Sequence, residues 1–198
     1  LEDLDFSASR KIIDDVFDSF CPNHISSSQV KYVTGQIYYV LTRIILQNNL
    51  PEERTEFLLL LDRSTDAEKL KEYLFEMLRN IEQSLKQARK HTNQLIRNAT
   101  NYIVQHLPED LSLESIADAV NANPSYLSRI FSKECGETIT EHITRIRIEK
   151  AKELLRFSDY FVYQISEATG FNDPAYFSTI FKKYTGMSPK EYKHHINL

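Results

Sequence analysis

The sequence contains few of the residues that interrupt regular structure or form covalent cross-links. Of its 198 residues, only 4 are Gly, 6 are Pro, 2 are Cys and none is Trp. Gly and Pro are the strongest helix breakers, so their scarcity favours helix along most of the chain. Cys21 and Cys135 lie far apart with no Cys-X-X-Cys pattern, which is typical of reduced, partly buried thiols. We therefore expect an all-α protein of the cytoplasm.

A dominant charge and a long hydrophobic run are also missing. The formal net charge is −4, and residues 95–198 carry nearly equal numbers of cationic and acidic side chains. DNA-binding domains are usually basic, so a nucleic-acid partner would have to be recognised by where the cations lie rather than by their number. No apolar run approaches the roughly 18 residues of a membrane span. This segment is therefore expected to make no membrane contact.

Patterns that catalysis and cofactor binding require are absent from the sequence. It has no Gly-rich phosphate loop, no His-Glu-X-X-His motif and no nucleophile elbow. The six His residues have no metal-type spacing with acids or cysteines. The expectation is a protein that is not an enzyme and that holds no metal and no cofactor.

Helical periodicity predicts two helices in the first 50 residues. The first helix runs from Ser9 to Phe20, and the second begins at one of Ser26–Ser28 and ends at Asn48-Asn49. Pro51-Glu52-Glu53 has the composition of another helix start. The residues expected to face inward are Ile12, Ile13, Val16, Phe17 and Phe20, and then Val30, Val33, Ile37, Tyr38, Leu41, Ile44 and Ile45.

A long periodic segment opens at Thr65 or Asp66. Its apolar stripe recurs every three or four residues, at Leu70, Leu74, Met77, Ile81, Leu85, Ala88, Thr92, Leu95, Ala99 and Tyr102. Two interpretations remain open: the stripe is buried against the preceding helices, or it forms the seam of a homodimer through residues 66–92. The turn at Pro108-Glu109-Asp110 ends the segment, and we expect a domain boundary near residues 88–94.

Two segments that lie about 50 residues apart repeat one another. The first copy reads Pro124-Ser125-Tyr126-Leu127-Ser128-Arg129-Ile130-Phe131 and ends at Gly136, after an Ile116-Ala117 pair. The second copy reads Pro174-Ala175-Tyr176-Phe177-Ser178-Thr179-Ile180-Phe181 and ends at Gly186, after an Ile165-Ser166 pair. Each copy predicts a short helix, a turn and a second helix. We place these helix–turn–helix units at about residues 112–136 and 162–186.

The outward faces of the two repeated helices are polar. Tyr126, Leu127, Ile130 and Phe131 are expected to face inward, as are Ala168, Tyr176, Phe177, Ile180 and Phe181 in the second copy. Small hydroxyls and cations outside suit a DNA major groove, because Arg can bind guanine with two N–H groups and Ser lets the backbone approach. Candidate base contacts are Ser125, Ser128, Arg129 and Ser132 in the first unit, and Ala175, Ser178, Thr179 and Lys182 in the second.

A helix of about residues 140–157 connects the two units. At ~1.5 Å per residue it spans about 25 Å, which with the width of the units places the outward helices roughly one DNA turn, ~34 Å, apart. The cations Arg145, Arg147, Lys150, Lys152 and Arg156 either contact DNA or form a solvated face with neighbouring Glu residues. Candidate phosphate contacts are Lys133, Arg145, Lys183, Ser188, Lys190 and Lys193.

The run Gly170-Phe171-Asn172-Asp173-Pro174-Ala175-Tyr176-Phe177-Ser178, followed by Phe181-Lys182-Lys183, Gly186, Ser188-Pro189 and Tyr192, resembles the signature of the AraC-type family of bacterial transcription regulators. The resemblance covers about residues 95–196. It implies an AraC-type DNA-binding domain of about seven helices over residues 93–198, which binds promoter DNA through two recognition helices. RNA polymerase is a further partner expected of such an activator.

Two residues depart from the pattern of that family. Thr179 stands where many relatives carry Arg, which suggests weaker base contacts by the second recognition helix. Asn121 stands in place of the usual turn Gly; of the non-Gly residues, Asn best tolerates left-handed backbone. Residues 1–92 resemble the helical middle segment of some relatives, which suggests a linker, dimerisation or signal-coupling role.

The first residue is Leu rather than Met, so we expect a fragment of a longer signal-responsive regulator. The alternative function is a helical protein-interaction or adaptor module. An adaptor should present apolar anchors on the outward helix faces. The Ser, Thr, Arg and Lys residues found there favour DNA.

Overall fold

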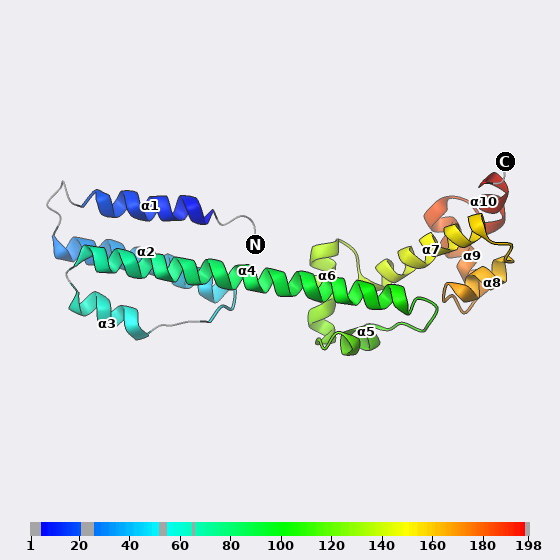
Figure 1. The fold of residues 1–198 in the computed structure, drawn as a ribbon, viewed down its shortest axis with the longest axis horizontal. Helices are drawn as coiled ribbons and strands as arrows, with labels where there is room; N and C mark the ends of the chain where they lie inside the picture. The colour runs from blue at the N-terminus through cyan, green and yellow to red at the C-terminus, as the bar shows by residue number, and fades with distance from the viewer. Residues whose placement is uncertain (1–4, 21–25, 52–54, 65, 197–198) are drawn as a thin grey trace. The chain divides into compact units, whose positions relative to one another are not determined.

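The computed structural model describes residues 5–20, 26–51, 55–64 and 66–196, and over these residues it is helical with no strand (Figure 1). This confirms the predicted all-α class. The chain divides into two compact units, residues 1–90 and 91–198. One helix, α4 (Ala67–Gln105), contributes its first part to the first unit and its last part to the second.

The first unit packs α1 (Phe6–Asp18), α2 (Ser27–Gln47) and α3 (Thr55–Arg63) with the first part of α4. Helix α1 begins three residues before the predicted start, because the Asp5 side chain accepts hydrogen bonds from the Ser7 and Ala8 backbone N–H groups. Ile12 was expected inside, but 61% of it is exposed. The predicted end of α2 is confirmed, with Asn48 as its C-cap.

Helix α2 starts after Ser26, which forms a capping box with Gln29. The predicted helix start at Pro51-Glu52-Glu53 lies mostly outside the described residues, as do Thr65 and Cys21. The core of the unit contains Ile13, Phe17, Val30, Leu41, Ile45, Phe57, Leu70, Leu74, Leu78 and Ile81.

The apolar stripe of α4 is buried in two places. Leu70, Leu74 and Ile81 belong to the core of the first unit, so the prediction that the stripe packs on the preceding helices is confirmed there. Leu95 and Ala99 belong to a core of the second unit. Between them Ala88 is exposed and Thr92 is half-buried. The sequence pattern placed Met77 and Tyr102 in the stripe, but both are only partly buried. The buried residues are their neighbours Leu78 and Ile103.

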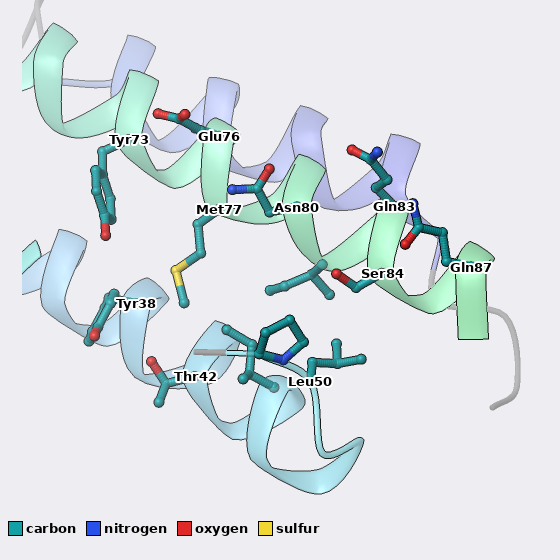
Figure 2. Close-up of a pocket in the computed structure, with 13 residues that line it drawn as sticks. Tyr38, Thr42, Leu50, Tyr73, Glu76, Met77, Asn80, Gln83, Ser84 and Gln87 are labelled. Carbon is teal, nitrogen blue, oxygen red and sulfur yellow. The ribbon is translucent and has the colours of Figure 1, made fainter. Parts of the chain in front are cut away.

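A pocket of about 380 Å³ lies in the first unit between α2 and α4 (Figure 2). Its wall combines rings, amides and hydroxyls with apolar side chains, among them Tyr38, Thr42, Tyr73, Met77 and Asn80. The buried Thr42 Oγ1 has no hydrogen-bond partner among the described residues. None of the candidate site residues lines this pocket.

The second unit contains the end of α4 followed by α5 (Leu113–Ala119), α6 (Pro124–Cys135), α7 (Ile139–Phe157), α8 (Val162–Ala168), α9 (Pro174–Thr185) and α10 (Pro189–Ile196). The expected seven helical segments are therefore present among the residues described. The first core joins α4, α5, α6 and the start of α7, and the second joins the rest of α7 to α8, α9 and α10. Helix α7 supplies Ile139 and Ile143 to the first core, and Ile148, Ala151 and Leu155 to the second.

Local caps define the two helix–turn–helix units. Ser112, Asn123 and Asp173 are the N-caps of α5, α6 and α9. Asn121 and Gly170 occupy equivalent turns, with φ of 53° and 80°. Gly136 and Gly186 end α6 and α9 in the left-handed conformation.

Helix α7 (Ile139–Phe157) confirms the predicted connecting helix of about residues 140–157, and Thr138 and Glu141 form a capping box at its start. One local prediction in this unit is wrong. Ala168 is exposed although it was expected in the core. The buried residue is the adjacent Thr169, whose hydroxyl donates to the Ile165 carbonyl at 2.7 Å. A Thr hydroxyl that is satisfied in this way can enter a core.

Candidate nucleic-acid interface

Helix α6 gathers the predicted base contacts of the first unit on one face. Ser125 and Arg129 are exposed, and Ser128 and Ser132 are half-buried. Their spacings of three and four residues place them on neighbouring turns of that face. The Arg129 guanidinium lies over the Tyr126 ring, 5.6 Å from its centroid. A cation–π contact of this kind limits the orientations of an exposed guanidinium before any ligand arrives.

Tyr126 and Tyr176 do not face inward as predicted. They are 37% and 57% exposed, whereas the adjacent Leu127 and Phe177 are fully buried. Consecutive helical residues point about 100° apart, so only one member of each pair can reach the core in the first turn. The two outward faces are therefore more aromatic than the sequence suggests, and each carries one phenol ring.

Helix α9 presents the second set of predicted base contacts. Ala175, Thr179 and Lys182 are exposed, and Ser178 is half-buried. The Ser178 hydroxyl donates to the Pro174 carbonyl at 2.9 Å, and the Thr179 hydroxyl donates to the Ala175 carbonyl at 3.1 Å. With these protons engaged, both hydroxyls offer lone pairs outward, which suits the amino groups of cytosine or adenine.

The candidate phosphate contacts differ in whether other groups of the protein already bind them. Lys133, Lys183 and Lys190 are exposed, and no ion pair with another described residue holds them. The Lys193 ammonium donates to the Ser158 and Tyr160 carbonyls, at 3.2 Å each. Ser188 caps α10, since its hydroxyl accepts from the Glu191 N–H at 3.3 Å. The Ser188 backbone N–H in turn donates to Glu191 Oε2 at 2.7 Å, and this hydrogen bond lowers the pKa of the Glu191 carboxyl.

Arg145 is engaged by a carboxylate. Its Nη2 lies 2.8 Å from Glu137 Oε1, and its Nε lies 3.2 Å from both carboxylate oxygens. His142 Nδ1 lies 2.7 Å from the same Oε1. The Arg145 hydrogen bonds, followed by the contact from His142, lower the pKa of Glu137 to about 2. Glu137, His142 and Arg145 form a cluster that joins the turn between α6 and α7 to α7. The sequence analysis did not predict this cluster.

Among the other cations of α7, two fit the solvated-face interpretation given above and one fits neither interpretation. Lys150 pairs with Glu153 at 2.9 Å, and Lys152 pairs with Glu149 at 2.7 Å, as a solvated face predicts. Arg147 does neither, because it is half-buried and donates to backbone carbonyls. Nothing in the sequence near Arg147 distinguishes it from its neighbours.

Other kinds of site find no support in the described part of the chain. No group of three or more His, Cys, Asp or Glu residues that could hold a metal comes together there. No helix among these residues is long and apolar enough to cross a membrane. Cys135 is a free thiol and is exposed, not partly buried as expected.

Two short helix pairs, each with a polar outward face and each packed on one connecting helix, define a double helix–turn–helix protein. Residues 116–195 match the family model described as a helix-turn-helix domain. The transcriptional regulatory protein YesN of Bacillus subtilis, itself uncharacterized, is 42% identical over 87 residues, which are 42% of this chain and 24% of YesN. The xylose operon regulatory protein of Escherichia coli K12 is 33% identical over 136 residues, or 68% of this chain and 35% of that protein.

A solved structure gives the same result. The C-terminal domain of AraT, a response regulator from Geobacillus stearothermophilus, is 41% identical and has a TM-score of 0.50, over 51% of this chain and 84% of that domain. Residues 116–195 are an AraC-family helix–turn–helix DNA-binding domain, and a helical segment precedes them in the chain. This confirms the resemblance inferred from the sequence. The chain spans between 24% and 61% of the length of the first curated relatives that it matches.

Proposed function

We propose that this chain is a sequence-specific transcription regulator that inserts α6 and α9 into successive major grooves of promoter DNA. The observation that carries the proposal is the pair of repeated helices, each capped at its start by a polar side chain and each presenting hydroxyls and cations outward. Both helices pack against the single helix α7. A protein built in this way can engage two half-sites on one face of the duplex.

The base contacts in this proposal are Ser125, Ser128, Arg129 and Ser132 on α6, and Ala175, Ser178, Thr179 and Lys182 on α9. Among them Arg129 offers the fork of N–H groups that guanine accepts. The exposed cations Lys133, Lys183 and Lys190, with the α10 start at Ser188, would contact phosphates. Arg145 and Lys193 can join them only by giving up the partners described above, so we expect them to contribute less.

The test is a selection of genomic fragments with the purified chain at two salt concentrations. Non-specific attraction to phosphate falls steeply as salt rises, whereas base contacts keep their preference. We expect a recurring bipartite sequence to survive the higher salt. Recovery of no common sequence at either concentration would overturn the proposal.

The adaptor alternative makes a different prediction for the same surface. Tyr126 and Tyr176 are exposed aromatic rings, and aromatic rings are frequent anchors of protein interfaces. Replacing both with Ser should abolish partner binding if the surface is an adaptor. In the DNA proposal the double variant keeps its target sequence, because the base contacts listed above remain.

The wider role of the chain is also a proposal. Residues 1–92 would couple a signal or dimerisation to DNA binding within a longer cytoplasmic regulator, and RNA polymerase would be contacted during activation. The apolar stripe of α4 limits how a homodimer through residues 66–92 can form. Leu70, Leu74 and Ile81 are already buried in the first unit, so the seam would use the end of this segment, around the exposed Ala88.

A further inference from the structure

Arg147 makes contacts that join the two helix–turn–helix units. Its Nη2 donates to the Glu109 carbonyl at 2.8 Å, and its Nε donates to the Leu107 carbonyl at 3.3 Å. The same guanidinium lies 5.6 Å from the centroid of the Phe171 ring. Leu107 belongs to the first core and Phe171 to the second. One side chain from the middle of α7 therefore contacts both halves of the second unit.

Gly170 brings the backbone of the second half against the same point. A Cβ atom at this position would lie 2.4 Å from the Leu107 carbonyl oxygen and 2.7 Å from Arg147 Nη2. Both distances are far below van der Waals contact, and φ is 80°. The α8–α9 turn, which sets the start of α9, thus touches the link that follows α4 with no room for a side chain.

The chemistry of the contact needs an arginine. The link after α4 presents two carbonyl oxygens, and a planar guanidinium can donate to both while its face covers an aromatic ring. A lysine ammonium has no such fork. Burial lowers the pKa of Arg147 from its usual high value, and a guanidinium remains charged in that environment. Among the described residues no carboxylate forms an ion pair with this half-buried cation, and its direct contacts are carbonyl groups and a ring.

We propose that Arg147 is a positioning residue that fixes the second helix–turn–helix unit against the first, so that the chain accepts only one spacing between its two DNA half-sites. The inference rests on the two-groove binding proposed above. Linked binding modules gain affinity only when their geometry allows both to bind at once. A fixed junction keeps α6 and α9 in one relative orientation and rejects half-sites that are rotated about the DNA axis.

The experiment uses three duplexes made from one fragment recovered in the selection. These are the fragment itself, a version with one base pair inserted between the half-sites, and a version that keeps the first half-site alone. One inserted base pair rotates the second half-site by about 34°. The wild-type chain should bind the inserted duplex at least about tenfold less tightly than the native one.

Arg147→Met should weaken binding to the native duplex, so that the affinities for the native and inserted duplexes differ by no more than about threefold. Its binding to the first half-site alone should not change. Arg147→Lys should give an intermediate ratio, because one ammonium cannot grip both carbonyls in the same way. Gly170→Ala disturbs the junction from the opposite side and should resemble Arg147→Met. The matched control is Arg156→Met on the same helix, where the cation is exposed and lies over Phe157.

The outcomes separate the two proposals. A wild-type chain that binds the native duplex no more tightly than the first half-site alone would refute two-groove binding itself. Equal wild-type binding to the native and inserted duplexes, or a wild-type preference that persists in Arg147→Met and Arg147→Lys, would refute the positioning role. Melting temperatures measured in parallel identify a variant that does not fold, and Arg147→Lys, the milder change, then decides.

Discussion

At the scale of single residues, exposure and existing partners distinguish the cations of the second unit from one another. Arg129 is exposed and rests on a ring, Lys190 is exposed, and Arg145 is held by Glu137. All three carry the same formal charge in the sequence. Their consequences for DNA binding should nevertheless differ, because a cation that keeps a protein partner gains less from a phosphate or a base.

Arg129→Ala should relax sequence preference at one position of the first half-site by about 1–3 kcal/mol, since a fork of hydrogen bonds to guanine is lost. The measurement is binding to the selected duplex and to its single-base variants. Lys133→Ala on the same helix serves as control and should weaken all these duplexes alike. Unchanged discrimination in Arg129→Ala would remove this residue from the base contacts.

Lys190→Ala should weaken binding to every duplex by a similar factor, because a phosphate contact carries no sequence information. The slope of log affinity against log salt should become shallower by about 1. A salt titration of the wild type and the variant measures this slope. Lys150→Ala, which breaks only the surface pair with Glu153, should leave the slope unchanged.

The lowered pKa of Glu137 predicts that the free energy of unfolding depends on pH in the acid range. Its pKa is about 2 in the folded chain, against an ordinary value of 4.5. A depressed carboxyl pKa stabilises the fold fully above about pH 4.5, and that stabilisation is lost as pH falls towards 2. Glu137→Gln should lower the free energy of unfolding at neutral pH by on the order of 1 kcal/mol, since Arg145 is partly in solvent.

The same variant should unfold with a flatter pH profile between about pH 2 and 4.5 than the wild type. Urea unfolding at several pH values in and above this window gives the measurement. Glu134→Gln, an exposed neighbour in α6, is the control and should keep the wild-type profile. Identical slopes in Glu137→Gln and wild type would show that the Arg145 ion pair does not stabilise the fold.

At the scale of elements, the two helix–turn–helix units end their recognition helices in the same way. Gly136 and Gly186 have φ of 73° and 80°, with open space where a Cβ would lie. An Ala at either position should therefore cost only the backbone strain, about 1–2 kcal/mol. The two losses should be similar, because no neighbouring atom adds a clash at either position.

Gly35 is a control position at which the same substitution by Ala should stabilise the fold rather than destabilise it. It lies inside α2 without a left-handed φ, and an added Cβ would meet only Leu61 Cδ2 at 4.0 Å. Gly35→Ala should stabilise the first unit by up to about 1 kcal/mol. Amide hydrogen exchange measures each unit separately in the intact chain. A gain in Gly136→Ala would contradict the strain argument.

At the scale of the whole molecule, α4 is the element that both units share. If residues 66–92 form a dimer seam, the chain should sediment at twice its mass of 23.2 kDa. Ala88→Asp should then return it to the monomer mass, because like charges would face each other across the seam. Asn93→Asp, just outside the segment, should remain dimeric. A wild-type monomer at all concentrations would exclude the seam.

The features that follow from neighbouring residues could be predicted from the sequence. The start of α2 at Ser26, the two helix–turn–helix units and the left-handed turn at Asn121 depend on residues a few places apart. Helix periodicity and capping are local, so they survive whatever the rest of the chain does. The repeat and the family signature are equally independent of packing.

Tertiary packing alone decided which partner each long side chain met. Arg147 finds carbonyls 38 and 40 residues earlier in the chain, while Arg145, two places before it, finds Glu137. Packing also turned Tyr126 and Tyr176 outward, although both had been expected to face inward. Sequence spacing determines the face of a helix, but it carries no information about which distant segment will cover that face. The sequence therefore determined the two helix pairs, and only the folded chain determined what holds one pair against the other.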